Sequence, residues 1–409
     1  NLTGDYFCSI WKTFTDDFHD IILTEEGDRV QHERDMFLYA WDVIDEGARP
    51  MAQRLSALGV TSVSLAAVYH SGKLLLPHNP KRCVLVLEDN RSYFPSDPGR
   101  YGTLRPAESE LLRGHNPEFW NEMLHEFHAC NIRVCAWVVV FHADRLARMY
   151  PEYALHNAWG EPSPHSLCPS GEEAFRYGLS LLEDVAASGV DELHLESAEY
   201  GGFLHGAHHE MQAYADCSGL ERLLSPCFCP ACIERAQRGG VDAERLREEV
   251  RNRAFRFFNL EPAELEDESL RQAWNRLRTQ RITEFYAQLR ARLDRRGLTV
   301  KVKPILWMTG GADPLCSGVD VRQLAPFIDG ALAAYPSSPQ DVEAFAARAR
   351  AFVPAHVPLS FGVRLMAPQT TRPEQVAEYL AAYRNQGVNS LFFYNYGMAP
   401  LPFLEALSQ

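Results

Sequence analysis

Short hydrophobic runs alternate along this chain with longer segments in which hydrophobic residues recur every three or four positions. A helical segment repeatedly ends in Gly or Asn and leads into a β-rich run, as in LSALGV before TSVSLAAV and RNQGV before NSLFFYNY. Glycine takes the left-handed conformation that ends a helix, and the run after it enters a sheet. Strands that alternate with helices form right-handed βαβ units and a parallel sheet.

Eight strands can be placed in this way, with five helices in the segments between them and a short helix after the last strand. The predicted strands are 36–42, 61–68, 133–141, 191–196, 299–307, 330–335, 358–365 and 389–395, and the predicted helices include 47–58, 117–129, 172–187, 339–351, 373–386 and 400–408. Eight such units predict an α/β fold, the (β/α)₈ TIM barrel. A doubly wound open sheet is the second interpretation, but WDVIDEG after the first strand is not a Gly-rich phosphate loop.

Two long insertions interrupt the repeating pattern. Residues 69–115 follow the second strand, and residues 200–297 follow the fourth strand with a His cluster, a Cys cluster and charged helices. We therefore expect an N-terminal cap segment over 1–35 and a single barrel over 36–409, in which 200–297 is a helical and metal-binding insertion. Both insertions follow the carboxyl ends of strands, where barrel enzymes build their sites.

Composition and charge exclude several classes of function. The 409 residues are 46% hydrophobic and 23% charged, as in an ordinary globular protein, and the net charge is −14. This balance argues against nucleic acid and anionic membrane surfaces as partners, and no run of 18 apolar residues predicts a membrane span. Scattered cysteines favour a reducing compartment such as the cytoplasm, although a chain that begins at Asn1 leaves secretion open. Because many barrels are dimers, we expect a homo-oligomer.

The segment SPCFCPAC places three cysteines in the pattern C-x-C-x-x-C, namely Cys227, Cys229 and Cys232. Three thiolates within six residues can surround one ion, and zinc takes four ligands in a tetrahedron. Either Cys168, in the loop after the third strand, or Cys217, nearer in sequence, can supply the fourth. Four thiolates leave no open position, so such a zinc would be structural and would hold the long loops over the barrel mouth.

A Cys after the third strand followed by C-x-C-x-x-C after the fourth resembles the zinc cluster of family 42 β-galactosidases, and this resemblance favours Cys168 as the fourth ligand. A second similarity is to bacterial barrel proteins described as glycoside-hydrolase-like. It covers residues 70–235 and rests on HNPKR (78–82), LCPS (167–170), LHLES (193–197), HGAHHE (205–210) and CFCPAC (227–232). It implies a bacterial barrel that acts on carbohydrate.

Carboxylates provide the candidate catalytic groups. In SGVDELHLESAEYGG, Leu193 and Leu195 share one face of a strand, and His194 and Glu196 share the other, so that Glu196 ends the fourth strand at the mouth. Glycosidases use two carboxyl groups, one as acid and one as base or nucleophile. We expect Glu196 as base or nucleophile. The candidate proton donors are Glu199, Glu210 and Asp42, the last at the end of the first strand.

The family 42 pattern is not complete in this chain. In the clan to which that family belongs, the two catalytic carboxylates end strands four and seven. The seventh strand here, SFGVRLM, ends in Arg364 and carries no carboxylate. The catalytic pair of that family is therefore not transferred to this sequence.

Aromatic, basic and imidazole side chains gather at the predicted strand ends and mouth loops. Aromatic faces stack on sugar rings, polar tips bind hydroxyls, and Lys303 with Arg364 can bind an anionic sugar or neutralise Glu196. The candidate substrate-binding residues are Trp41, His70, His142, His194, His205, His208, His209, Lys303, Trp307, Arg364, Tyr394 and Asn395.

These patterns favour a glycoside hydrolase whose substrate is a carbohydrate and which needs no redox cofactor. Two other functions stay open at this stage. One is a metal-dependent sugar isomerase or lyase that uses Glu196 and the histidines, which would bind a labile ion in addition to the zinc. The other is a non-catalytic carbohydrate-binding barrel, which the missing carboxylate on strand seven supports.

Overall fold

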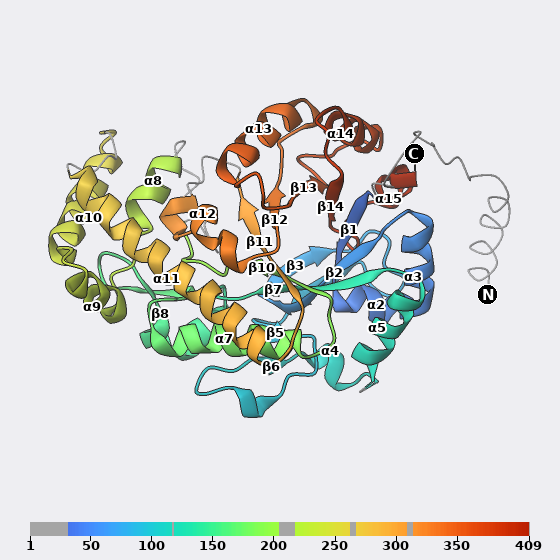
Figure 1. Cartoon of the computed structure of the whole chain (residues 1–409), viewed down its shortest axis with the longest axis horizontal. Helices are drawn as coiled ribbons and strands as arrows, with labels where there is room; N and C mark the ends of the chain where they lie inside the picture. The colour runs from blue at the N-terminus through green and yellow to red at the C-terminus, as the bar shows by residue number, and fades with distance from the viewer. Residues whose placement is uncertain (1–31, 117, 204–216, 262–266, 309–313, 409) are drawn as a thin grey trace. The chain divides into compact units, whose positions relative to one another are not determined.

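Eight parallel strands form a closed barrel in the computed structural model (Figure 1). The structure describes residues 32–116, 118–203, 217–261, 267–308 and 314–408, with the backbone alone over 217–220 and 314–315, and all of these residues belong to one unit, His32–Gln409. The barrel closes because β1 pairs with both β2 and β14. Its strands are β1 (Glu33–Leu38), β2 (Ser62–Tyr69), β7 (Arg133–Val139), β10 (Glu192–Glu196), β11 (Lys301–Trp307), β12 (Ala331–Ala334), β13 (Leu359–Arg364) and β14 (Ser390–Tyr394). This arrangement confirms the predicted (β/α)₈ barrel.

Helices between consecutive strands surround the barrel (Figure 1). They are α2 (Ala40–Glu46), α3 (Ala48–Ala57), α5 (Phe119–Ala129), α7 (Glu172–Ala186), α11 (Glu268–Arg295), α12 (Val321–Leu324), α13 (Val342–Phe352) and α14 (Glu374–Asn385), and α15 (Leu401–Glu405) follows the last strand. Each covers the outer face of the sheet with buried apolar side chains, as Phe345 and Ala349 do on α13.

Three excursions extend from the carboxyl ends of β2, β7 and β10. After β2 come β3 (Gly72–Leu75), β4 (Val84–Leu87), β5 (Arg91–Ser92), β6 (Ala107–Glu108) and α4 (Glu110–Arg113). After β7 come α6 (Asp144–Met149), β8 (Ala154–His156) and β9 (Pro162–Leu167), and after β10 come α8 (Cys217–Leu224), α9 (Pro230–Arg238), α10 (Ala243–Phe258) and α11. Figure 1 shows α8, α9 and α10 gathered on one side of the barrel.

The first strand lies earlier in the sequence than predicted, at Glu33–Leu38 and not at 36–42. The chain enters α2 immediately after Tyr39, because the Asp42 carboxylate accepts the backbone N–H of Tyr39 at 2.9 Å and so caps the helix. The run MFLYAWD is apolar through both elements, and periodicity cannot divide a buried strand from a buried helix. Asp42 is therefore a helix residue. Most of the predicted cap segment, residues 1–31, lies outside the described residues.

Charged side chains fill the lower half of the barrel interior. Lys303 Nζ lies 2.5 Å from Glu192 Oε2, and His194 Nε2 lies 3.2 Å from the same oxygen. The other ring nitrogen of His194 lies 2.6 Å from Ser64 Oγ, which donates to Asp35 Oδ2 at 2.6 Å. Burial raises the pKa of Glu192, but the hydrogen bonds and charges of His194 and Lys303 outweigh burial and hold it well below its usual range. The buried charges are thus mutually compensated.

Gly362 on β13 faces the crowded upper interior. A Cβ atom at this position would lie 2.5 Å from Tyr335 Cδ1 and 2.6 Å from Phe392 Cζ. We expect Gly362→Ala to lower the free energy of unfolding by about 1–3 kcal/mol, because these buried rings cannot withdraw without repacking. Chemical denaturation measures this. Gly114→Ala, where a Cβ would meet nothing within 4 Å, is the control and should stay within about 0.5 kcal/mol of the wild type. Equal stability of the two variants would contradict the packing argument.

Candidate active site and metal centre

Glu196 ends β10 and points into the barrel mouth, as the alternation predicted. Its side chain is buried, with 8% of the residue exposed, and its Oε2 accepts a hydrogen bond from Trp137 Nε1 at 2.6 Å. Burial raises the pKa of Glu196 to about 7, although the Trp137 hydrogen bond lowers it in part. A carboxyl group with this pKa can exchange its proton near neutral pH, as an acid–base catalyst must.

A second carboxyl group follows three residues later. Ser197 adopts a φ of +51°, a left-handed conformation that costs a non-glycine residue about 1 kcal/mol or more. The backbone there is fixed because Phe141 donates its N–H to Ser197 O at 2.9 Å. Burial, together with the charge of Glu196, raises the pKa of Glu199 to about 8. Glu196 therefore ionises first, and Glu199 keeps its proton because a negative charge is already near.

Aromatic side chains surround the Glu196 carboxylate. The hydroxyl of Tyr39 lies 3.2 Å from the hydroxyls of Tyr69 and Tyr394. The Tyr69 and Tyr394 rings stand edge-on to Trp137, at centroid distances of 4.8 Å and 5.8 Å. Burial raises the pKa of Tyr69 and of Tyr394, and the charge of Glu196 raises both further. The phenols therefore stay protonated and can donate hydrogen bonds.

Arg364 ends β13 at the same rim, where the seventh strand lacks a carboxylate. Its guanidinium lies 5.9 Å from the centre of the Tyr394 ring, and its Nε has no hydrogen-bond partner among the described residues. No carboxylate of the described chain lies within ion-pair distance of it. Arg364 therefore does not neutralise Glu196 within the described part of the protein.

Three predicted substrate-binding residues are buried away from the mouth, and we leave them out of the proposed substrate site. His194 and Lys303 are only 2% and 6% exposed and belong to the interior ion-pair network with Glu192. Alternation predicts which way a strand residue faces but not its depth in the barrel, which explains both errors. Trp41 is fully buried and stacks on Tyr39 with centroids 4.2 Å apart, so its ring cannot receive a sugar.

Asp42, on α2, and Asn395, which follows β14, both contact Gly397 in the loop beside the mouth. A Cβ atom on Gly397 would lie 2.2 Å from Asp42 Oδ1, which shows how closely the carboxylate meets that loop. Burial raises the pKa of Asp42 to about 8, and only 1% of the residue is exposed. Asn395 is fully buried, and its Oδ1 accepts the N–H of Gly397 at 3.0 Å. We therefore assign Asp42 to the helix start and not to proton donation.

The other predicted residues divide into those at the rim and those that are not described. Trp307 is 40% exposed, and its ring lies 5.8 Å from Tyr335. His70 stacks on His142 with centroids 4.4 Å apart and an interplanar angle of 8°. Glu210, His205, His208 and His209 lie outside the described residues.

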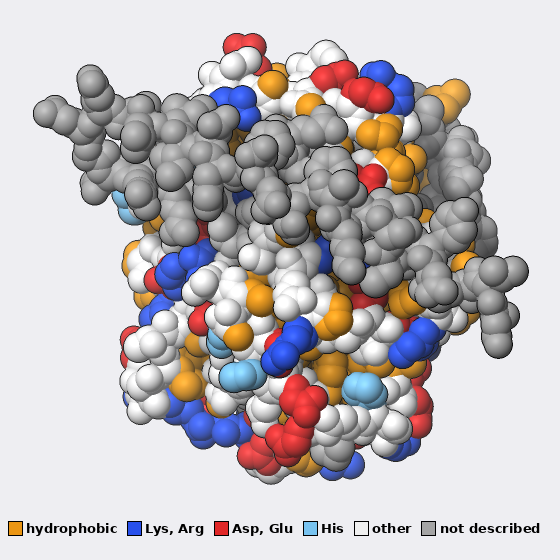
Figure 2. Space-filling model, turned by 90° about the vertical axis from the view of Figure 1, so that its right-hand side faces the viewer, with side chains coloured by type: hydrophobic (Ala, Val, Ile, Leu, Met, Phe, Trp, Pro, Cys, Tyr) orange, Lys and Arg blue, Asp and Glu red, His pale blue; other side chains and the backbone are white. Residues whose placement is uncertain are grey.

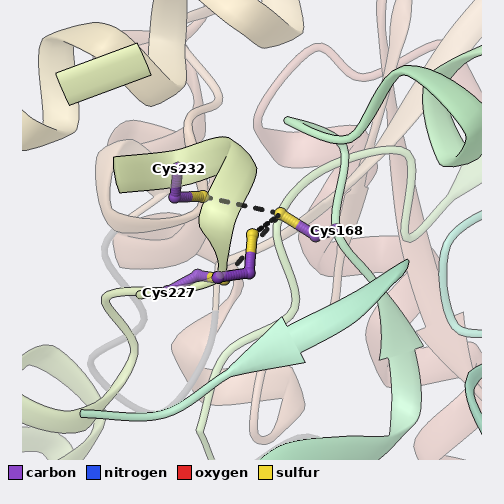
Figure 3. A group of neighbouring side chains, drawn as sticks. Cys168, Cys227 and Cys232 are labelled. Atoms are coloured by element: carbon purple, nitrogen blue, oxygen red, sulfur yellow. Dashed lines mark hydrogen bonds between the residues drawn. The ribbon is translucent and has the colours of Figure 1, made fainter. Parts of the chain in front are cut away.

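Four cysteines form a compact, buried cluster (Figure 3). The sulfur of Cys168 lies 3.8 Å from Cys227, 3.5 Å from Cys229 and 3.5 Å from Cys232. Ligands of one tetrahedral zinc, with Zn–S bonds of about 2.3 Å, are about 3.8 Å apart. The cluster could therefore hold a metal ion. Cys168 completes it, and the side chain of Cys217, the alternative ligand, is outside the described part of the protein.

The surroundings of the cluster suit a metal site. The backbone N–H of His156 donates to Cys227 Sγ at 3.2 Å, and Ser170 Oγ lies 3.2 Å from Cys232 Sγ. Such contacts orient ligands and delocalise thiolate charge. Cys168 follows β9, whereas Cys227 precedes α9, Cys229 is its N-cap residue and Cys232 lies in its first turn. A bound ion would therefore join the excursions that follow β7 and β10.

Two residues with metal-ligand chemistry were missed in the sequence. Asp144 and His165 lie close to His142, and one potential ligand atom from each of the three residues lies within 4.8 Å of the others. The run HAD at 142–144 was the available signal, since it places an imidazole and a carboxylate directly after the third strand. Nothing in the sequence indicated that His165 folds back beside them.

Charged side chains of both signs lie on the described surface. On the face drawn in Figure 2, basic and acidic side chains are interspersed, and the coloured residues there form no broad basic surface. Among the described helices, none has the length and apolar composition needed to cross a bilayer.

The chain forms a (β/α)₈ barrel with the buried Glu196 carboxyl group at the end of β10, and the solved structures that it resembles include glycosidases. α-L-Fucosidase isoenzyme 2 from Paenibacillus thiaminolyticus matches with a TM-score of 0.54 and 13% identity, over 92% of this chain and 48% of that one. A β-galactosidase from the psychrophilic Marinomonas ef1 matches with a TM-score of 0.54 and 10% identity, over 92% and 58%.

A third similar structure is the β-galactosidase from Bacillus circulans sp. alkalophilus, with a TM-score of 0.51 and 14% identity over 89% of this chain and 50% of that one. The chain thus spans about half the length of the structures it matches, and at these identities the likeness shows the fold. No protein-family model and no curated protein sequence matches the chain.

Proposed function

We propose that this protein is a glycoside hydrolase whose catalytic groups are Glu196 and Glu199. The observation that carries the proposal is the buried Glu196 carboxyl group with the half-buried Glu199 near it, their pKa values raised to about 7 and about 8. When the environments of two carboxyl groups give them different pKa values, the group with the lower pKa can act as the base and the other as the acid. Near neutral pH, Glu196 is substantially ionised and Glu199 holds its proton.

In the proposed reaction, Glu199 donates its proton to the glycosidic oxygen as the bond to the anomeric carbon breaks. Glu196 either removes a proton from the water that attacks that carbon, or attacks the carbon itself and forms a glycosyl ester. In the second case water then hydrolyses the ester, and Glu199 takes up the proton of that water. Trp137 holds the Glu196 carboxylate through its 2.6 Å hydrogen bond. The low exposure of Glu196 keeps bulk water away from the developing positive charge.

The rim side chains suggest how a sugar is held. Tyr394 and the more exposed Trp307 offer aromatic rings, and Tyr394 adds a hydroxyl group, which together suit the alternating apolar and polar surfaces of a sugar ring. Arg364 adds a cation that no described carboxylate neutralises. A guanidinium binds a carboxylate through two parallel hydrogen bonds, so we propose that the preferred substrate carries an acidic sugar.

We further propose that the four-cysteine cluster holds a structural zinc ion. The sulfur spacings of 3.5–3.8 Å fit a tetrahedral site, and four thiolates leave no position for water or substrate. The ion would stabilise the loops at the mouth and take no part in bond cleavage.

Turnover of aryl glycosides tests the proposed activity. The panel contains pyranosides, furanosides and uronides, and we expect release of the aryl group from at least one member, with uronides preferred. The pH profile of kcat/KM should be bell-shaped, because activity rises as Glu196 ionises near pH 7 and falls as Glu199 loses its proton near pH 8. The two limbs report the coupled pair.

Trp137→Phe provides the check on this profile. It removes the hydrogen bond that lowers the pKa of Glu196, so the acidic limb should move to higher pH by more than the alkaline limb does. Sugar binding without turnover across the whole panel would contradict the hydrolase and favour a binding barrel. The absence of a carboxylate on the seventh strand is the observation that favours that second function.

A further inference from the structure

A cluster of imidazole and carboxylate groups lies where the chain leaves the carboxyl end of β7. His142 and Asp144 follow β7, and His165 lies on β9. One ligand atom from each of the three lies within 4.8 Å of the others. Two ligands of one ion with bonds of about 2.1 Å are at most about 4.2 Å apart, so a shift of less than an ångström would seat a metal.

The backbone presents these residues from a rigid support. Ala143 donates its N–H to His165 O at 2.9 Å, and Leu167 donates to Phe141 O at 2.9 Å. His142 is also bridged to Ser166 in an antiparallel arrangement. The segment 141–143 therefore pairs with 165–167, which fixes His142 and His165 on neighbouring chains.

The Asp144 carboxylate is held in place and has capacity to bind an ion. The residue is fully buried, and Ser71 donates both its backbone N–H, at 3.2 Å, and its hydroxyl to Asp144 Oδ2. The other oxygen, Oδ1, is buried and has no hydrogen-bond partner among the described residues. A buried carboxylate oxygen without a partner is costly, and a cation would remove that cost.

We propose that His142, Asp144 and His165 bind a divalent transition-metal ion. Two imidazoles and one carboxylate suit zinc and its neighbours better than magnesium or calcium, which prefer oxygen ligands alone. Three protein ligands leave a coordination position for water or a substrate hydroxyl. The cysteine cluster has no such position, so this second ion should exchange with solvent more readily.

The site is continuous with the proposed catalytic centre through contacting rings. His142 stacks on His70, which stacks on Tyr69 at 4.2 Å, and Tyr69 contacts Trp137, the hydrogen-bond partner of Glu196. The metal proposal itself rests on the ligands and not on the glycosidase activity.

Metal analysis of the intact protein tests this proposal. The protein is dialysed against a mild chelator, loaded with Zn²⁺, and analysed for zinc per chain before and after a second dialysis. We expect one ion that resists the chelator and one that is removed and restored. Asp144→Asn keeps an oxygen that can accept the Ser71 N–H, and should weaken the labile ion at least about tenfold while retaining the resistant one. His165→Ala should also lose only the labile ion.

His128→Ala is the matched control. His128 lies 2.9 Å from Asp191 and so repeats the imidazole–carboxylate pair without the third ligand. This variant should bind both ions as the wild type does. The proposal is overturned if the wild type takes up no labile ion, or if Asp144→Asn and His165→Ala bind it as tightly as the wild type. Retention of the resistant ion and a cooperative thermal transition show that the variants are folded.

Discussion

Glu196→Gln is expected to lower the turnover of the best aryl glycoside by roughly 10³-fold or more while the protein stays folded. The amide cannot attack the anomeric carbon or accept a proton from water. It still offers an oxygen to Trp137 Nε1, so the hydrogen bond at 2.6 Å survives. Steady-state kinetics and thermal unfolding of the same preparation measure both effects.

The change in stability that Glu196→Gln causes has a predicted direction. The pKa of Glu196 is raised from 4.5 to about 7 in the folded protein, so the native state loses stability relative to the unfolded chain as pH rises between these values. Glutamine removes that loss, and Glu196→Gln should be at least as stable as the wild type at pH 8. Glu122→Gln, on the exposed face of α5, is the control and should change neither property. Turnover unchanged in Glu196→Gln would exclude Glu196 from the chemistry.

Cys168→Ser is expected to lose the chelator-resistant ion and to have the largest effect on stability. A structural zinc contributes of the order of 10 kcal/mol to the folding of small domains, and the barrel should lose a part of this when one ligand is removed. The ion joins Cys168, after β9, to the cysteines around α9, so its loss should release that excursion from the mouth. Zinc content and thermal unfolding measure the effect.

Cys130→Ser separates this loss from the general effect of removing a thiol. Cys130 is half-buried at the end of α5 and belongs to no group of metal ligands. It should keep the wild-type zinc content and a similar melting temperature. A Cys168→Ser protein that binds zinc as the wild type does would show that the cluster is not the metal site, whatever its sulfur spacing.

The barrel could be predicted because its determinants are local. Five of the strands, β2, β7, β10, β11 and β14, follow a helix that ends near a Gly or Asn with positive φ, and all eight predicted strands are present. The exception is the first strand, where Met36–Leu38 and Trp41 are equally apolar although they belong to different elements. The capping hydrogen bond between Tyr39 and Asp42 sets that boundary, and a hydrophobic pattern does not contain it.

The sequence predicts which way the side chains of the site face, but not how deep in the barrel they lie. Alternation placed Glu196 inward, but the register of β10 with β11 decides that Lys303 lies beside His194 and pairs with Glu192, below the mouth. Contacts of this kind join strands that are far apart in the sequence, and they are set by the register of the closed sheet. His165 is brought beside His142 by β9 folding back along the end of β7, which no local signal in either segment reveals.

The central claim is that Glu199 acts as the acid for a bond broken at Glu196, and leaving-group dependence in Glu199→Gln tests it most directly. The measurement is kcat/KM of this variant, relative to the wild type, for a dinitrophenyl glycoside and for the methyl glycoside of the same sugar. A dinitrophenolate leaves without protonation, whereas methoxide does not. We predict near-normal activity on the dinitrophenyl substrate and a loss of roughly 10²-fold or more on the methyl glycoside. An equal loss on both substrates, or no loss on either, would contradict the account.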